Sequence, residues 1–116
     1  MPPTPLHRLL RTEPHGDDLL ATVYGEIDFC TAPTLAGGLS ALAQTTRPRL
    51  LIDLRHIDFI DCSGRRALTA TRDIVTVRRG RLRLVCTRPL TRTVLHRPPY
   101  LRPFDIIPGL PALPAA

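Results

Sequence analysis

A nearly continuous apolar run at residues 50–54, with the sequence LLIDL, limits the fold of this 116-residue chain more than any other feature. An alternating pattern would indicate a strand with one face in water, but here four of the five residues are aliphatic. Continuous apolar strands are typical of the middle of a parallel sheet, where both faces are covered. The run therefore predicts a central strand of an α/β fold in a chain long enough for one domain.

Periodicity and turn residues predict the remaining elements. The predicted strands are 6–12, 19–24, 50–54 with 57–60 following, 81–86 and 104–107, and the turn cluster 13–17 joins the first two. The predicted helices run from an N-cap at Thr31 to before Pro48, from the turn 61–64 to a stop at Gly80, and from Pro89 through Leu95 to Pro98-Pro99. This order predicts a single α/β domain whose mixed, mainly parallel sheet carries helices and starts with an antiparallel hairpin.

Apolar spacing also predicts which side chains face the core. Leu35, Leu39 and Leu42 share one face of the first predicted helix, and Gly37 and Gly38 within it indicate close packing or a local bend. The inward positions expected for the second helix and for the strand 81–86 are Ala67, Leu68, Thr71, Ile74 and Val75, and Leu82, Leu84 and Cys86.

Thirteen prolines lie mostly towards the two ends of the sequence. We therefore expect a flexible tail at 1–5, the folded domain at 6–107 and a proline-rich tail at 108–116.

Charge and composition exclude several classes of function. The formal net charge is +6, and all sixteen basic residues are arginines, distributed along the chain from Arg8 to Arg102. Nucleic-acid binding is not expected, since the arginines do not cluster and aromatic residues make up only 4%. No apolar run is long enough for a membrane span, and no paired metal-ligand spacing or glycine-rich phosphate loop occurs. We expect no membrane association, no metal and no cofactor.

The three cysteines, Cys30, Cys62 and Cys86, have no CxxC spacing, and no secretory signal pattern starts the sequence. We therefore expect reduced thiols and a cytoplasmic protein.

The turn at residues 61–64, Asp-Cys-Ser-Gly, is the strongest candidate site. A helix N-terminus presents unpaired amides and the positive end of a dipole, so a phosphate on Cys62 or Ser63 would be stabilised there. The structural alternative is that Asp61 or Ser63 only caps the helix.

Four blocks give this turn a wider context: GEID at 25–28 followed by TAP at 31–33, LIDL at 51–54, FIDCSG at 59–64, and GRLRLV at 80–85. Their order and separation over about residues 16–107 resemble the STAS domain family, and more narrowly bacterial anti-sigma factor antagonists.

The resemblance implies a binding protein rather than an enzyme. Such antagonists bind an anti-sigma factor that is also an ATP-binding serine kinase. This binding releases the sigma factor for transcription. Phosphorylation at this turn breaks the complex, and Asp28 and Asp61 would strengthen the repulsion of the phosphate. The positions implied to contact the partner are Asp28, Thr31, Asp61, Cys62, Ser63, Gly64, Arg65 and Arg66. The sequence does not indicate an oligomeric state.

The chain departs from the family at the phosphoacceptor, which is the hydroxyl residue directly after the aspartate and is Cys62 here. A thiol is not a substrate of a serine kinase. Three outcomes follow: partner binding is constitutive, Ser63 serves as an alternative phosphoacceptor instead of a helix cap, or control passes to Cys62. We favour loss of the phospho-switch with binding retained. The alternative is a divergent STAS scaffold or signalling subunit, thiol-responsive through Cys62 and a nearby Cys30.

Two further observations leave alternatives open. Arg65 replaces an apolar residue of the family and forms a basic pair with Arg66, which either contacts an acidic partner surface or is solvated. His56, Asp58 and Cys62 supply the residue types of a base, an orienting carboxylate and a thiol nucleophile. Because no oxyanion site or substrate cleft accompanies them, we expect no catalytic activity.

Overall fold

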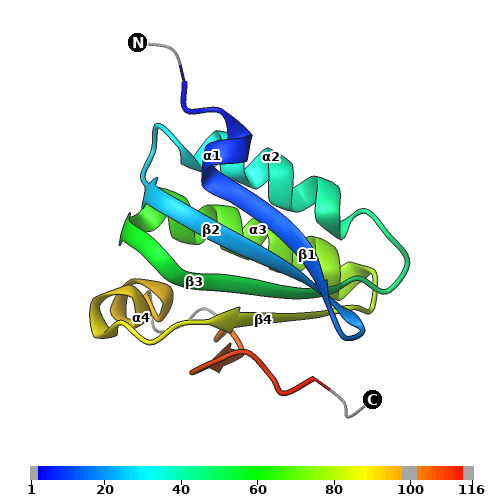
Figure 1. Cartoon of the computed structure of the whole chain (residues 1–116). Helices are drawn as coiled ribbons and strands as arrows, with labels where there is room; N and C mark the ends of the chain where they lie inside the picture. Colours follow the sequence, from blue (N-terminus) through cyan, green and yellow to red (C-terminus); the bar gives the residue numbers. More distant parts are fainter. Residues whose placement is uncertain (1–2, 98–101, 114–116) are drawn as a thin grey trace.

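The computed structural model describes residues 3–97 and 102–113 and shows a mixed sheet with helices on one face (Figure 1). The strands are β1 (Leu10–His15), β2 (Asp18–Ile27), β3 (Arg49–Ile60), β4 (Arg81–Val85) and β5 (Ile106–Ile107). The helices are α1 (Leu6–Leu9), α2 (Ala32–Ala43), α3 (Cys62–Val77) and α4 (Pro89–Leu95).

The strands are ordered β1-β2-β3-β4-β5 across the sheet. β1 pairs antiparallel with β2, and every other neighbouring pair is parallel. In Figure 1, α2 and α3 lie side by side behind the sheet, and α4 lies beside the carboxyl end of β3. The predicted fold class, the antiparallel hairpin and the central place of residues 50–54 are confirmed.

β3 is longer than predicted because 50–54 and 57–60 form one strand. Its pairing with β2 shifts register twice, once between Thr22 and Tyr24 and once between Gly25 and Glu26. Each shift places an extra residue in β3, so strict alternation is lost. Ile57 and Ile60 are consequently both buried on the helix side, three residues apart.

The N-terminal segment corrects the sequence prediction. Residues 6–9 form a short helix rather than the start of a strand, and β1 extends through His15 instead of ending in a turn at Glu13. Only Gly16 and Asp17 turn the chain, and Gly16 has a φ of 60°. Short hairpin turns require such left-handed residues, so the pattern 13–17 overstated the length of the turn.

Gly38 and Gly37 of α2 have different surroundings. A Cβ on Gly38 would lie 2.7 Å from a Leu6 methyl carbon, whereas no atom of the described residues lies within 4 Å of one on Gly37. The predicted close packing is therefore confirmed at Gly38, where α1 lies on α2. Leu35 and Leu39 are buried as expected, and Leu42 is half-buried.

The later elements follow the prediction with two corrections. α4 has the predicted bounds, but β5 is limited to two residues. The left-handed residue after α3 is Arg79, with a φ of 57°, rather than Gly80. Gly80 instead permits close approach to the preceding loop, because a Cβ there would meet the Pro48 carbonyl oxygen at 2.0 Å. The predicted stop at Pro98-Pro99 lies outside the described residues.

The buried side chains predicted for the second helix and the fourth strand are largely confirmed. Ala67, Leu68, Thr71 and Val75 are buried and Ile74 is half-buried, and Leu82, Leu84 and Cys86 belong to the helix-side core.

The opposite face of the sheet also has buried aliphatic residues. Leu20, Leu51 and Val85 are buried but lie outside the helix-side core. The C-terminal segment reaches the tip of the hairpin, where the His15 ring nitrogen lies 2.8 Å from the Pro111 carbonyl oxygen. This contact extends the packed structure beyond residue 107.

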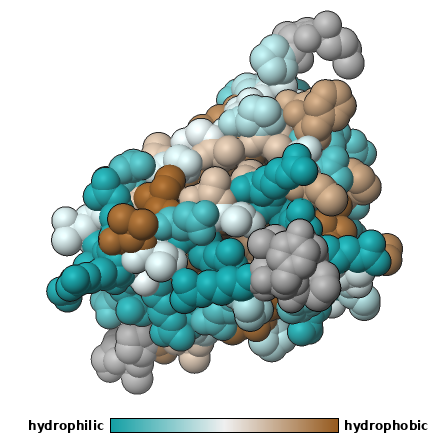
Figure 2. All heavy atoms as spheres, turned by 180° about the vertical axis from the view of Figure 1, so that it is seen from behind, coloured by the Kyte–Doolittle hydropathy of each residue, from teal (hydrophilic) through white to brown (hydrophobic). Residues whose placement is uncertain are grey.

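From the helix side, the surface is mostly hydrophilic, with hydrophobic residues in small separate groups (Figure 2). Within residues 3–97 and 102–113, no helix is long and apolar enough to cross a membrane.

Candidate functional site

Two loops lie together where β2 and β3 end. Ile27 and Ile60 are partners in the last pair of these parallel strands, and the Asp61 amide donates to the Ile27 carbonyl oxygen at 3.2 Å. The loop 28–31 and the turn 61–64 are thereby held side by side. We call residues 28–31 and 61–66 the double-loop surface.

Asp61 caps α3. Its Oδ1 accepts hydrogen bonds from the amides of Ser63 at 2.8 Å and Gly64 at 3.2 Å. Ser63 lies within the first turn of the helix, so the expectation that its hydroxyl caps α3 is wrong. The Asp61 carboxylate also occupies amides that an anion would otherwise use.

The loop 28–31 is ordered by an analogous network. Oδ1 of Asp28 accepts from the amides of Cys30 at 2.9 Å and Thr31 at 3.1 Å. The Thr31 hydroxyl donates to the Glu26 carbonyl oxygen at 2.7 Å and accepts from the Asp28 amide at 3.0 Å. Thr31 occupies the predicted cap position of α2, but its hydroxyl makes no cap bond to that helix and braces the loop instead.

Gly64 allows α3 to start close to the sheet. A Cβ there would lie 2.6 Å from Cγ1 of Ile60 and 3.0 Å from the carbonyl oxygen of Ile27. Only a glycine fits this position without displacement of the strand ends. Gly64 thus positions the double-loop surface without being exposed on it.

The exposed residues of the double-loop surface include Cys30, Cys62 and Arg66. Both cysteines are free thiols, and Ser63 is half-buried. Position 62, at the first residue of α3, is therefore accessible to another molecule.

Arg65 differs from its neighbour Arg66. It is only 9% exposed, and its guanidinium donates to the carbonyl oxygen of Arg97 beyond α4. Among the residues that the structure describes, its Nε has no hydrogen-bond partner. The alternative of a solvated Arg65 is therefore wrong, because the side chain links the first turn of α3 to the end of α4.

Sequence patterns missed two exposed aromatic residues near this surface. Phe29 is 74% exposed and lines a shallow groove with Ser63 and Arg66. Phe59 at the end of β3 is 51% exposed. Phe29 lies between Asp28 and Cys30 in a polar loop and does not fit the apolar spacing of any predicted core face. Its exposure could therefore have been predicted from the sequence.

The structure does not assemble the catalytic alternative. His56 stacks on Tyr24, with ring centroids 5.6 Å apart, and its Nε2 lies 3.7 Å from the carboxylate of Asp53. In the described part of the chain, no hydrogen bond links His56 or Asp58 to Cys62. No group of three or more potential metal ligands occurs among residues 3–97 and 102–113.

This architecture is similar to that of known proteins. A sequence profile of the STAS domain matches residues 10–110. The chain therefore belongs to the STAS domain family.

Three solved structures are similar in fold. An anti-sigma factor antagonist from Mycobacterium paratuberculosis has a TM-score of 0.77 and 29% identity, over 94% of this chain and 92% of that chain. The anti-sigma factor antagonist SpoIIAA in its unphosphorylated form has a TM-score of 0.66 and 16% identity, over 87% and 89% of the respective chains. The crystal structure of Mglu has a TM-score of 0.62 and 21% identity, over 73% of this chain and 21% of that one. No match was found among curated protein sequences.

Proposed function

We propose that this chain is an anti-sigma factor antagonist-like protein that binds an anti-sigma factor of the ATP-binding serine kinase type. The double-loop surface is the contact region, and sigma-factor-dependent transcription is the regulated process. Cys62 replaces the phosphoacceptor, so binding is not released by phosphorylation.

The observation that carries this proposal is the exposure of Phe29, Cys62 and Arg66 on two loops that are otherwise braced by hydrogen bonds. A rigid surface with an exposed aromatic residue and an arginine has the composition of a protein interface. Membership of the STAS domain family and the structural likeness to the Mycobacterium antagonist support the same function.

The roles within the contact region differ. Asp28, Thr31, Asp61 and Gly64 shape it through the hydrogen bonds and close packing described above. Arg65 contributes from beneath by holding α4 against α3. These residues support the contact, whereas Phe29, Cys62, Ser63 and Arg66 meet the partner.

Affinity capture from the source cell's lysate tests the partner. The tagged protein is used with and without ATP, captured proteins are identified by mass spectrometry, and the intact mass of the bait is measured. We expect capture of the anti-sigma factor, a serine kinase with a histidine-kinase-like ATP-binding domain. The mass of the bait should not change with ATP. Phe29→Asp should abolish capture, and Val77→Asp, at the far end of α3 and also highly exposed, should not. Absence of such an ATPase would refute the antagonist function.

The Cys62→Ser variant tests the lost switch. Restoring a hydroxyl at the accessible first residue of α3 should let the captured kinase add one phosphate to this residue when ATP is present. The complex should then dissociate. Cys62→Ala retains capture and gains no phosphate. Phosphate on the wild-type bait, mapped to Ser63, would show that Ser63 has replaced position 62 as acceptor.

A second candidate is a thiol-responsive scaffold, favoured by the exposure of Cys30 and Cys62 in adjoining loops. Mild oxidation would then change partner capture in the wild type but not in the double variant Cys30→Ser, Cys62→Ser. Equal capture before and after oxidation would exclude this function.

A further inference from the structure

A cleft between the end of β3 and α4 lies beside the double-loop surface but is not part of it. Its volume is about 560 Å³, within the range of about 300–1,000 Å³ typical of small-molecule sites. Ile60, Leu90 and Val94 contribute apolar lining, and Leu90 is 82% exposed. A concave and mostly apolar lining with a few polar groups is the usual form of a small-molecule site.

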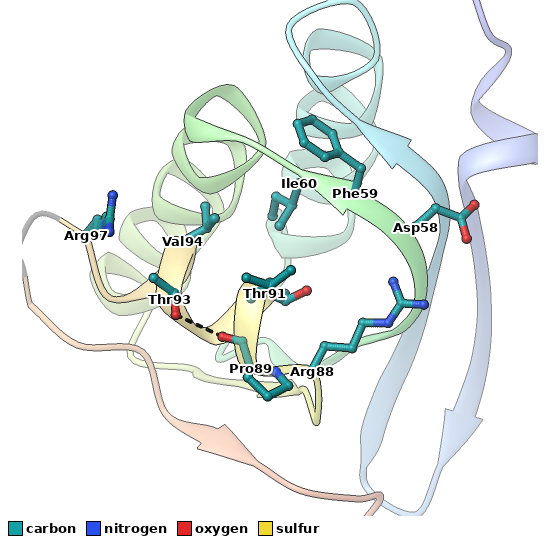
Figure 3. Close-up of a pocket in the computed structure, with 10 residues that line it drawn as sticks. Asp58, Phe59, Ile60, Arg88, Pro89, Thr91, Thr93, Val94 and Arg97 are labelled. Atoms are coloured by element: carbon teal, nitrogen blue, oxygen red, sulfur yellow. Dashed lines mark hydrogen bonds between the residues drawn. The ribbon is translucent and has the colours of Figure 1, made fainter.

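Charge at the ends of the cleft indicates the chemistry of that molecule. Arg88 and Arg97 stand at opposite ends of α4 and flank Ile60 and Val94 (Figure 3). Among the described residues neither arginine forms an ion pair. Arg88 donates one hydrogen bond to the Ile57 carbonyl oxygen at 2.7 Å, which leaves other guanidinium donors available. The one carboxylate of the lining, Asp58, points away from the cleft (Figure 3).

We propose that this cleft binds a small amphipathic anion, with an apolar body against Ile60, Leu90 and Val94 and a carboxylate or similar group on an arginine. An apolar molecule without charge would leave the arginines unused, and a fully polar anion would leave the apolar lining in water. Charge-assisted hydrogen bonds from a guanidinium to a carboxylate favour the amphipathic molecule over both. The proposal does not require an anti-sigma partner.

The cleft is connected to the double-loop surface by the chain itself and by a hydrogen bond. Ile60 leads directly into Asp61, and the Arg97 carbonyl oxygen accepts from Arg65 in the first turn of α3. Both walls of the cleft are thus linked to the start of α3. Occupancy should therefore be detected at the Arg65 amide as well as within the cleft.

Titration of the isotope-labelled full chain with decanoate, below its micelle concentration, tests the proposal by amide chemical shifts. We expect saturable shifts in the amides of residues 58–60, 88, 90–97 and Arg65. Decan-1-ol, which has the same chain without the charge, should bind about tenfold more weakly, and acetate should not bind detectably.

Matched variants separate the cleft from general charge and hydrophobicity. Arg97→Gln should weaken decanoate binding about tenfold, whereas Arg92→Gln, within α4 but outside the lining, should not. Leu90→Asp should abolish binding, and the equally exposed Val77→Asp should leave it intact. Amide spectra of each free variant confirm that it is folded.

Several results would overturn the proposal. These are unsaturable shifts, equal affinity for decanoate and decan-1-ol, or equal effects of the Arg97 and Arg92 variants. Binding to anionic phospholipid vesicles without binding to monomeric decanoate would assign the cleft to a lipid surface instead. Binding of an acidic peptide alone would assign it to a protein segment. Because no anti-sigma factor is present, failure here leaves the proposed function standing.

Discussion

Gly64 has a larger structural role than its missing side chain suggests. It lets the first turn of α3 pack directly on Ile27 and Ile60, so the helix start and the strand ends behave as one rigid unit. A glycine inside a helix normally lowers stability, and here the close approach offsets that cost.

We expect Gly64→Ala to lower the free energy of unfolding by about 1–3 kcal/mol, because a Cβ would overlap Ile60 and the Ile27 backbone. Urea denaturation followed by circular dichroism measures the change. Gly37→Ala is the control, since in the described part of the chain no atom lies within 4 Å of its Cβ position. The control should be neutral or more stable by up to about 1 kcal/mol. Equal effects of the two substitutions would show that the close approach is unimportant.

At the scale of the element, β3 combines a buried charge with its two irregularities. Asp53 is buried, and Arg55 donates to it through Nε at 2.9 Å and Nη2 at 2.9 Å. Burial by itself raises the pKa of the Asp53 carboxyl, but the hydrogen bonds and charge of Arg55, with a smaller effect from His56, lower it below its ordinary value.

This lowered pKa gives stability a defined pH dependence. The contribution of the Asp53 carboxylate is present above the pKa of the unfolded chain, about 4, and is lost as pH falls through the lower folded pKa. We expect Arg55→Met to be about 1–3 kcal/mol less stable than the wild type at pH 7, because a buried carboxylate loses its partner. The difference should shrink as the pH falls below 4.

Urea titrations at a series of pH values measure this dependence. Arg81→Met is the control, since Arg81 and Asp105 are each 54% exposed and 3.9 Å apart. Such an exposed pair contributes less than about 1 kcal/mol. A constant difference between the Arg55 variant and the wild type at every pH would argue against a role for the Asp53 charge.

The elements of this fold differ in how well sequence patterns predict them. The run 50–54, the bounds of α4 and the core face of α3 follow from local apolar spacing and proline, and the structure confirms them. The register shifts of β3 depend on pairing with β2, which no local pattern records. Likewise, α1 packs on α2 through Leu6 and Gly38, which are far apart in sequence, so local patterns do not record this contact.

The candidate site shows the same division. Asp61 as cap and the proximity of the loops could be predicted from helix-start chemistry and parallel strand order. The burial of Arg65 could not, because its partner is a carbonyl of Arg97 at the far end of α4. The apolar cleft was also missed, since it forms only when β3 and α4 come together.

At the scale of the whole molecule, the three thiols report on different environments. Cys30 and Cys62 are exposed, whereas Cys86 is 1% exposed in the core. Burial raises the pKa of the Cys86 thiol. The contact with the Arg88 carbonyl oxygen and the charge of Arg92 lower the pKa by less, so it stays above its ordinary value. Cys86 is therefore both shielded and poorly ionised at neutral pH.

We expect iodoacetamide to alkylate two thiols rapidly in the folded protein and the third only on unfolding. Intact-mass measurement counts the adducts over time, with and without urea. The double variant Cys30→Ser, Cys62→Ser should take up no label while folded. Rapid labelling of that variant without denaturant would mean that the core opens more readily than its packing implies.

The hairpin of β1 and β2 bears on the order in which the chain folds. Its strands are joined by only two residues, whereas each parallel pairing closes a much longer loop. Closing a longer loop costs more conformational entropy before any contact forms. We expect the hairpin to be formed early, as a template on which β3 docks. Val23→Ala should then mainly slow refolding in stopped-flow experiments, and Leu84→Ala should mainly speed unfolding. The reverse pattern would place the folding nucleus in the parallel half of the sheet.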